Sequence, residues 1–299
     1  MKYKLKNGVE IYIDQFLKYQ LDSLIYNISQ DWDFVLIISG DGMVRTGKSV
    51  LAMIICAYLA DKLNTPFTLE KNVHFDSQVM IDKAQNTPPH SIHLYDEARE
   101  GLATVKRFTK VQQDLVDFFN ECGQLNHIFV LVLPDYFSLN WELATNRSEC
   151  LINVYRKEKG VERRLKGTQE KGPVTIFQRG YFEFYNRKKK EQLYHKAKRT
   201  GIKQYGIVMP NFRGRFTNIY PLDEEGYRKL KKDALTRFAE RHKEEVIKVK
   251  PSEKVACQLL QLLKERGENF SELARIYGYS TKYFHEFLRK MEEKIAKCP

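Results

Sequence analysis

The stretch Phe34-Val-Leu-Ile-Ile-Ser39, followed by Gly42-Met-Val-Arg-Thr-Gly47-Lys48-Ser49, decides the fold class of this 299-residue chain. Its first part is a continuous apolar run, which is typical of a strand buried on both faces of a parallel sheet. Its second part has the Walker A spacing G-x-x-x-x-G-K-S, and residues 50–63 after it read as a helix. A strand, a glycine-rich loop and a helix in this order predict a phosphate-binding loop in an α/β fold.

The Walker A segment is expected to hold the phosphates of ATP. Its successive backbone N–H groups and the start of the following helix favour a bound anion. Lys48 would reach the β- and γ-phosphates and assist catalysis, and the Ser49 hydroxyl would bind Mg²⁺. A chance glycine-rich turn is the alternative, which the preceding strand and the Lys-Ser pair disfavour. The predicted nucleotide-binding residues are Gly42, Met43, Val44, Arg45, Thr46, Gly47, Lys48, Ser49 and Val50.

Two adjacent carboxylates, Asp96 and Glu97, follow the apolar run Ser91-Ile-His-Leu-Tyr95. A carboxylate at the end of such a strand has the Walker B position, where it holds Mg²⁺ beside Ser49. A second carboxylate directly after it can orient and deprotonate the attacking water, so Glu97 is the predicted catalytic base. The alternative is that both residues only cap the start of a helix. We favour hydrolysis of ATP, with Ser49 and Asp96 as the metal ligands.

Further apolar runs and helical segments extend the α/β pattern. Residues 127–133 and 150–155 are predicted strands, 72–75 is a short strand, and 76–85 and 110–122 are predicted helices. Alternating strands and helices indicate a parallel sheet with right-handed connections. The pattern changes after residue 155, so we expect residues 1–155 to form the ATPase core with an N-terminal lead-in.

The rest of the chain is expected to form two additions to this core. Residues 156–250 read as a basic accessory β/helical region, with a hairpin over 174–186 around Gln178-Arg-Gly180 and a basic turn at Lys188-Lys-Lys190. Residues 251–299 begin at Pro251 and resemble a helix-turn-helix, with helices at 252–266, 271–277 and 281–293. A small helical bundle that binds protein is the alternative for this tail.

The positive charge is concentrated in the accessory region. Residues 1–155 contain 14 Lys and Arg against 19 Asp and Glu, whereas residues 156–250 contain 27 against 12. A basic block beside a slightly acidic core indicates a polyanionic partner, and DNA is the expected one, although a solvated positive face would give the same counts.

Composition also limits where the protein acts. No stretch approaches the roughly 18 to 20 apolar residues of a membrane span, and the start of the chain lacks the features of a secretory signal. The five cysteines are scattered without metal-ligand spacing. We therefore expect a cytoplasmic protein with no membrane span and reduced cysteines.

Polar residues near the third strand are candidates for a γ-phosphate sensor or an arginine finger. Pro134-Asp135, Ser138 and Asn140 follow the strand at 127–133 and are sensor candidates, although Asp135 also fits the start of a turn. The candidate trans-acting arginines, which stabilise the charge of the transferred phosphoryl group from a neighbouring subunit, are Arg99, Arg107 and Arg147. We slightly favour Arg147.

The motifs Arg45-Thr-Gly-Lys-Ser49, Tyr95-Asp-Glu-Ala98 and Phe129-Val-Leu-Val-Leu-Pro-Asp-Tyr-Phe137 resemble those of the zonula occludens toxin-like P-loop ATPases, which belong or lie close to the FtsK–HerA superfamily. The resemblance covers about residues 33–155. It implies a RecA-like core with Glu97 as the catalytic base, in relatives that act on DNA in viruses, plasmids and chromosomes. The absence of an evident transmembrane helix departs from the filamentous-phage members.

Three functions are compatible with this reading. The leading one is an oligomeric ATPase, a hexamer or other ring, that binds and moves DNA during translocation, packaging or replication. A second is an ATP-gated DNA-binding or assembly switch with slow turnover. A third is an assembly or packaging factor whose basic block binds protein. Stimulation of ATP hydrolysis by DNA of any sequence would favour the motor.

Overall fold

The computed structural model describes residues 1–40, 42, 45–96, 110–164 and 171–247, together with single positions after residue 265. The chain divides into two compact units, Met1–Lys229 and Leu230–Pro299.

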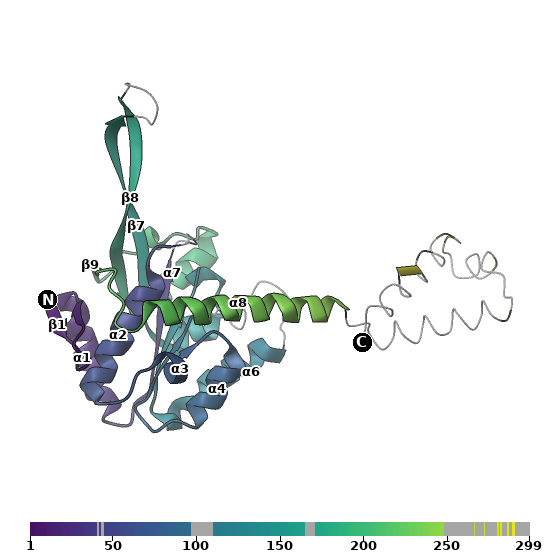
Figure 1. Cartoon of the computed structure of the whole chain (residues 1–299), viewed down its shortest axis with the longest axis horizontal. Coiled ribbons are helices and arrows are strands. Elements are labelled where there is room, and N and C mark those ends of the chain that lie inside the picture. The colour runs from purple at the N-terminus through teal and green to yellow at the C-terminus, as the bar shows by residue number, and fades with distance from the viewer. Residues whose placement is uncertain are drawn as a thin grey trace. The chain divides into compact units, whose positions relative to one another are not determined.

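A seven-stranded sheet forms the centre of the first unit, in the order β4-β5-β6-β3-β7-β8-β9 (Figure 1). The strands from β4 to β7 are mutually parallel, whereas β8 pairs antiparallel with both β7 and β9. This arrangement confirms the predicted α/β class and its parallel strands. The strands are β3 (Phe34–Gly40), β4 (Val73–His74), β5 (Ile92–Tyr95), β6 (Ile128–Val132), β7 (Ser148–Arg164), β8 (Lys171–Asn186) and β9 (Phe212–Arg215).

Helices cover both faces of the sheet. Successive side chains of a strand point to opposite faces, and in the central strands both sets of side chains are apolar, so each face needs a covering layer. Leu36 and Ile38 of β3 pack in one core with α1 (Gln15–Ile28) and α2 (Lys48–Leu63). Val35 and Ile37 pack in a second core with α4 (Ser77–Gln85), α6 (Lys110–Glu121) and α7 (Arg187–Thr200). The result is a three-layer α/β/α unit.

The remaining elements are short or lie near the ends of the unit. They are a two-stranded sheet of β1 (Lys2–Lys4) and β2 (Glu10–Tyr12), helix α3 (Leu69–Asn72), the short turns η1 (Cys122–Leu125), η2 (Tyr136–Ser138), η3 (Leu143–Arg147) and η4 (Tyr205–Ile207), and α8 (Glu224–Ile247). Helix α8 begins in the first unit and continues past Lys229 into the second.

Strands β7 and β8 form a long paired arm that extends beyond the other strands (Figure 1). The boundary expected at residue 155 falls inside β7, since the strand runs from the core sheet into the arm without a break. The predicted turn at Gln178-Arg-Gly180 is wrong, because these residues lie within β8. Gly180 has φ = 90°, and an added Cβ would lie 2.5 Å from the carbonyl oxygen of Phe216. The glycine therefore marks an irregularity in the strand, next to a register shift between Tyr155 and Lys157.

The predicted basic turn at 188–190 is also wrong, because these residues form the first turn of α7 after the capping residue Asn186. Lys190 is fully buried, and its ammonium donates to the carbonyl oxygens of Ala144 (2.7 Å) and Thr145 (2.8 Å). These carbonyls belong to η3. Burial lowers the pKa of Lys190 to about 8. Lys190, which the sequence suggests is a surface residue, is thus buried and links α7 to η3 through these two hydrogen bonds.

Three buried histidines lie together beneath the second helical layer. His74 Nε2 lies 3.1 Å from His93 Nδ1, and the hydroxyl of Thr87 bridges His93 (3.0 Å) and His127 (3.3 Å) through their Nε2 atoms. Burial lowers the pKa of His74 to about 4 and that of His93 to about 3, and it also lowers the pKa of His127. The cluster is therefore neutral at pH 7.

The predicted helix-turn-helix falls almost entirely outside the described residues. Of the positions that are described there, Lys290 pairs with Glu286 at 3.0 Å. No helix in the described part of the chain has the length and apolar composition needed to cross a membrane.

Candidate functional site

The Walker A loop joins the end of β3 to the start of α2, as the sequence predicts. Gly47 caps α2 in a left-handed conformation, with φ = 101°, which a residue with a Cβ rarely adopts. The N–H of Gly42 donates to the carbonyl oxygen of Pro134 at 3.2 Å, which ties the loop to the chain after β6. Met43 and Val44 lie outside the described residues. The other seven predicted nucleotide-binding residues, Gly42, Arg45, Thr46, Gly47, Lys48, Ser49 and Val50, lie along this loop and the first turn of α2.

The ammonium of Lys48 lies over its own loop. Its Nζ is 3.5 Å from the hydroxyl oxygen of Thr46, a residue that is almost completely buried. An added Cβ on Gly40 would meet this same Nζ at 3.2 Å, so the lysine also lies close to the end of β3. The positive charge is therefore held at the mouth of the loop, where the predicted phosphates would lie.

Ser49 and Asp96 meet at the carboxyl edge of the sheet. The hydroxyl of Ser49 donates to Oδ1 of Asp96 at 3.2 Å, and only 1% of Asp96 is exposed. β5, which carries Asp96 at its end, is separated from β3 by β6. The two side chains still meet because parallel strands end at the same edge and α2 starts there. The structure thus brings together the two residues predicted as metal ligands.

This pair fits Mg²⁺ by its chemistry. Mg²⁺ prefers hard oxygen ligands, keeps several waters and takes only one or two protein ligands beside the phosphates of a nucleotide. A serine hydroxyl and a buried carboxylate are such a set. No group of three or more His, Cys, Asp or Glu suited to a metal occurs among the described residues, so this fit rests on the Ser-Asp pair alone.

Tyr227, in the first turn of α8, completes the contacts of Asp96. Its hydroxyl donates to Oδ2 of Asp96, and 3% of the residue is exposed. Its ring lies 5.8 Å from that of Phe75 and 5.9 Å from that of Tyr220. Burial raises the pKa of Tyr227 and the neighbouring carboxylate raises it further, whereas the nearby hydroxyl of Ser49 lowers it. The phenol therefore stays protonated and acts as a donor.

Two other aromatic residues after the arm contact the Walker A loop or the end of β3 that leads into it. The ring of Phe216 would lie 3.1 Å from a Cβ added to Gly47. The hydroxyl of Tyr205 donates to the carbonyl oxygen of Gly40 at 2.7 Å and lies 2.9 Å from the hydroxyl of Ser39. Sequence reasoning missed these residues and Tyr227, because none belongs to a motif and all lie in the region assigned to an accessory role.

The remaining predicted catalytic and sensor residues divide into two groups. Glu97, Arg99 and Arg107 lie outside the described residues. Asp135 caps η2 by accepting from the N–H of Phe137 at 3.1 Å, and Asn140 accepts from the N–H of Glu142 at 2.9 Å. These contacts are those of turns, and the sensor role stays a prediction.

Arg147 lies at the opposite end of the sheet from the Walker A loop. It directly precedes β7, and its guanidinium pairs with Asp33, which directly precedes β3. The same guanidinium donates to the carbonyl oxygen of Phe119 in α6 and lies 3.5 Å from the sulfur of Cys122. These internal partners give Arg147 a structural role, and its position gives no support for the predicted arginine finger.

The base of the arm holds positive charges against aromatic rings. Lys157 Nζ lies 4.4 Å from the centre of the Tyr181 ring, and the guanidinium of Arg215 lies 5.3 Å from it. Lys157 and Arg215 are exposed, and each gains from the negative face of the ring. A similar contact places Arg156 3.9 Å from the centre of the Phe177 ring, but Glu158 lies 3.7 Å from Arg156 and offsets its charge. The better candidate for a polyanion site is therefore the group of Lys157, Tyr181 and Arg215, and not Arg156 with Phe177.

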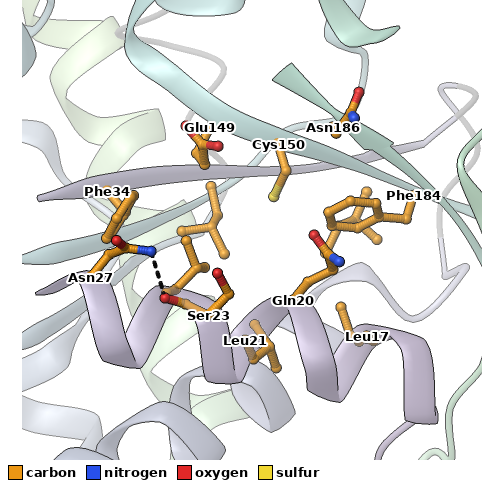
Figure 2. Close-up of a pocket in the computed structure, with 13 residues that line it drawn as sticks. Leu17, Gln20, Leu21, Ser23, Asn27, Phe34, Glu149, Cys150, Phe184 and Asn186 are labelled. Atoms are coloured by element: carbon orange, nitrogen blue, oxygen red, sulfur yellow. Dashed lines mark hydrogen bonds between the residues drawn. The ribbon is translucent and has the colours of Figure 1, made fainter. Parts of the chain in front are cut away.

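A small cavity of about 100 Å³ lies elsewhere, between α1 and the sheet (Figure 2). Figure 2 shows Leu17 and Leu21 of α1 on one side of it and Cys150 and Phe184 of the strands on the other. It shares no lining residue with the Walker A loop or with Asp96. Burial raises the pKa of the Cys150 thiol to about 12, so this cysteine is not a nucleophile.

Comparison with known proteins gives no relative for this chain. No protein-family model matches it, and neither a curated protein nor a solved structure does so.

Proposed function

We propose that this chain is a P-loop ATPase with a RecA-like core that acts on DNA, as the resemblance to the zonula occludens toxin-like ATPases implies. The observation that carries the proposal is the contact between Ser49 and Asp96 at the start of α2. These residues are 47 positions apart, and separate motifs indicate them, a Walker A pattern for Ser49 and a Walker B position for Asp96. Their meeting is what a shared metal site requires.

Each described residue of the site has a distinct part in this function. The N–H groups at the start of α2 and the ammonium of Lys48 bind the phosphates, and Ser49 with Asp96 holds the cation. When bound, Mg²⁺ would neutralise charge on the β- and γ-phosphates. Glu97, which follows Asp96 in sequence, is proposed to deprotonate the attacking water.

Replacement of Lys48 tests the nucleotide site. Lys48→Ala should abolish measurable binding of ATP, because the terminal phosphates lose their charged partner, while the apolar core is unchanged. Isothermal titration calorimetry with ATP and Mg²⁺ measures the affinity, and the melting temperature checks the fold. Lys71→Ala, at an exposed lysine of α3, is the matched control and should bind as the wild type does. Tight ATP binding by Lys48→Ala would overturn the phosphate-loop assignment.

The proposed DNA partner is supported by the cations at the base of the arm. The exposed Lys157 and Arg215 lie on one tyrosine ring, in a region with an excess of 15 positive residues (27 Lys and Arg against 12 Asp and Glu in 156–250). Phosphate contacts release counterions, so each of them adds about 0.9 to the slope of log affinity against log salt concentration for duplex DNA.

A double variant, Lys157→Gln with Arg215→Gln, tests this patch. It should weaken DNA binding and reduce the salt slope by about two, one for each lost contact. Fluorescence anisotropy with a labelled duplex between about 50 and 200 mM salt gives both quantities. Lys71→Gln should leave them unchanged. A double variant with wild-type affinity and slope would remove this patch from the proposed DNA site.

An ATP-gated switch with slow turnover is the second candidate function. The contact of Tyr227 with Asp96 favours it, since the start of α8 lies on the proposed metal pair. The rate of ATP hydrolysis with and without DNA separates the two functions. Strong stimulation by DNA of any sequence supports a motor, whereas slow hydrolysis with ATP-dependent DNA binding supports a switch. Either form is proposed to act as a homo-oligomeric ring.

A further inference from the structure

The first turn of α8 lies on the two side chains that form the proposed metal pair. Both carboxylate oxygens of Asp96 are engaged, Oδ1 by the hydroxyl of Ser49 and Oδ2 by the hydroxyl of Tyr227. The Ser49 hydroxyl also lowers the pKa of Tyr227, so the two hydroxyl groups lie near one another on the same carboxylate. The phenol thus contacts Asp96 directly and lies close to Ser49, although it lies 131 residues after Asp96.

A bound Mg²⁺ ion needs the same space. Ser49 would hold the ion through its hydroxyl oxygen, and Asp96 would accept hydrogen bonds from waters on the ion. The phenol of Tyr227 takes one acceptor position on Oδ2 of Asp96 and places its ring beside the carboxylate, which reduces the room for waters on a cation. The Tyr227 contact and a hydrated Mg²⁺ ion would therefore compete for this pair.

We propose that Tyr227 and Mg-nucleotide compete for the Ser49–Asp96 pair, so that nucleotide binding displaces the first turn of α8. This inference rests on the proposed function and adds regulation to the same site. The closed form is the one described here, with Tyr227 on Asp96 and Phe216 against Gly47. In the open form, Oδ2 of Asp96 would accept a hydrogen bond from a water on the cation in place of the Tyr227 hydroxyl.

The local structure shows how far such a displacement extends. Asp223 caps the first turn by accepting from the N–H groups of Glu225 and Gly226, each at 3.0 Å. The N–H of Tyr227 donates to the carbonyl oxygen of Asp223 at 3.1 Å. The capped turn therefore moves with Tyr227, and α8 continues from it past Lys229. Nucleotide binding would in this way reach the helix that leads into the second unit.

The substitution Tyr227→Phe tests the competition directly. It keeps the ring between Phe75 and Tyr220 and removes only the hydroxyl. A hydrogen bond to a charged group no longer has to be broken, so the variant should bind Mg-ADP about tenfold more tightly than the wild type. Its affinity for ADP in EDTA should be unchanged, because the effect acts through the metal pair. Isothermal titration calorimetry measures both affinities.

Tyr58→Phe is the matched control. The Tyr58 hydroxyl donates to Asp22 between α2 and α1, away from the metal pair, so its removal should not change the affinity for Mg-ADP. Equal or weaker binding of Mg-ADP by Tyr227→Phe, relative to the wild type, would overturn the competition.

Hydrogen exchange of the wild-type chain provides a second test that needs no variant. Addition of Mg-ADP should speed exchange of the amides at residues 223–229, and ADP in EDTA should not. Unchanged or slower exchange with Mg-ADP bound overturns the displacement. If the wild type binds Mg-ADP but these effects are absent, only the inference fails. If neither the wild type nor Tyr227→Phe binds nucleotide at millimolar concentration, the proposed function fails with it.

Discussion

At the scale of single residues, the candidate site depends on one hydrogen bond between Ser49 and Asp96. A buried carboxylate needs partners, because removal from water otherwise disfavours its charged form. Asp96 has two hydroxyl donors, one from α2 and one from α8. These two hydrogen bonds fix the orientation of the carboxylate, with Oδ1 facing the start of α2 after the Walker A loop.

Glu97→Gln should separate binding from hydrolysis. The amide keeps the shape of the side chain but cannot accept a proton, so we expect normal affinity for ATP and turnover reduced by roughly 10²-fold or more. Phosphate release measures turnover, and calorimetry measures affinity. Turnover equal to that of the wild type would show that another group activates the water.

At the scale of elements, buried charges tie strand ends to the helical layer. Arg147 links the starts of β3 and β7 to α6, and Lys190 links α7 to η3. From the sequence, Arg147 is predicted as an arginine finger and Lys190 as part of a basic surface turn. In the fold, their charged groups donate hydrogen bonds to backbone carbonyl groups, and Arg147 also pairs with the carboxylate of Asp33. These partners lie at the ends of helices and strands, where the backbone has no regular hydrogen-bond partner.

Arg147→Ala should therefore lower stability. Its loss leaves Asp33 without its partner in a mostly buried position, and we expect the free energy of unfolding to fall by about 2 to 4 kcal/mol. Urea denaturation measures this change. The control is Arg187→Ala, an exposed arginine 4.0 Å from Glu149, whose loss should cost less than about 1 kcal/mol. A fully stable Arg147→Ala protein with no ATPase activity would instead restore the arginine-finger hypothesis.

At the scale of the whole molecule, the buried histidines make stability depend on pH. In the unfolded chain each histidine binds a proton near pH 6.5, whereas the pKa values of His74 and His93 in the fold are about 4 and 3. Between these pKa values the unfolded state binds more protons than the folded state. The contribution of the neutral histidines to the free energy of unfolding is therefore fully present above about pH 6.5 and is lost as the pH falls towards 4.

The free energy of unfolding should accordingly fall between pH 7.5 and pH 5. His93→Gln should reduce this dependence, because one buried imidazole no longer has to stay neutral. Urea denaturation at several pH values gives the slope for each protein. His195→Gln, at an exposed histidine of α7, should keep the wild-type slope. The same slope in His93→Gln as in the wild type would show that other groups dominate the pH dependence.

The sequence by itself determined the α/β class, the run of parallel strands and the candidate metal ligands. These features depend on local information, namely apolar runs of strand length, the glycine and lysine spacing after β3, and a carboxylate directly after β5. Each can be read within about ten residues of chain. The two strands that carry the site were predicted to within one residue at either end, as Phe34–Gly40 and Ile92–Tyr95 show.

Only the tertiary structure decided which distant groups meet. The packing of α8 places Tyr227 on Asp96, and the sheet places Arg147 at the far end of its strands from Lys48. The sheet also places Gly180 inside a strand, against the backbone of Phe216. The physical reason is that local pattern sets which side of an element is apolar, whereas the partner of a buried polar group depends on packing between elements far apart in the chain.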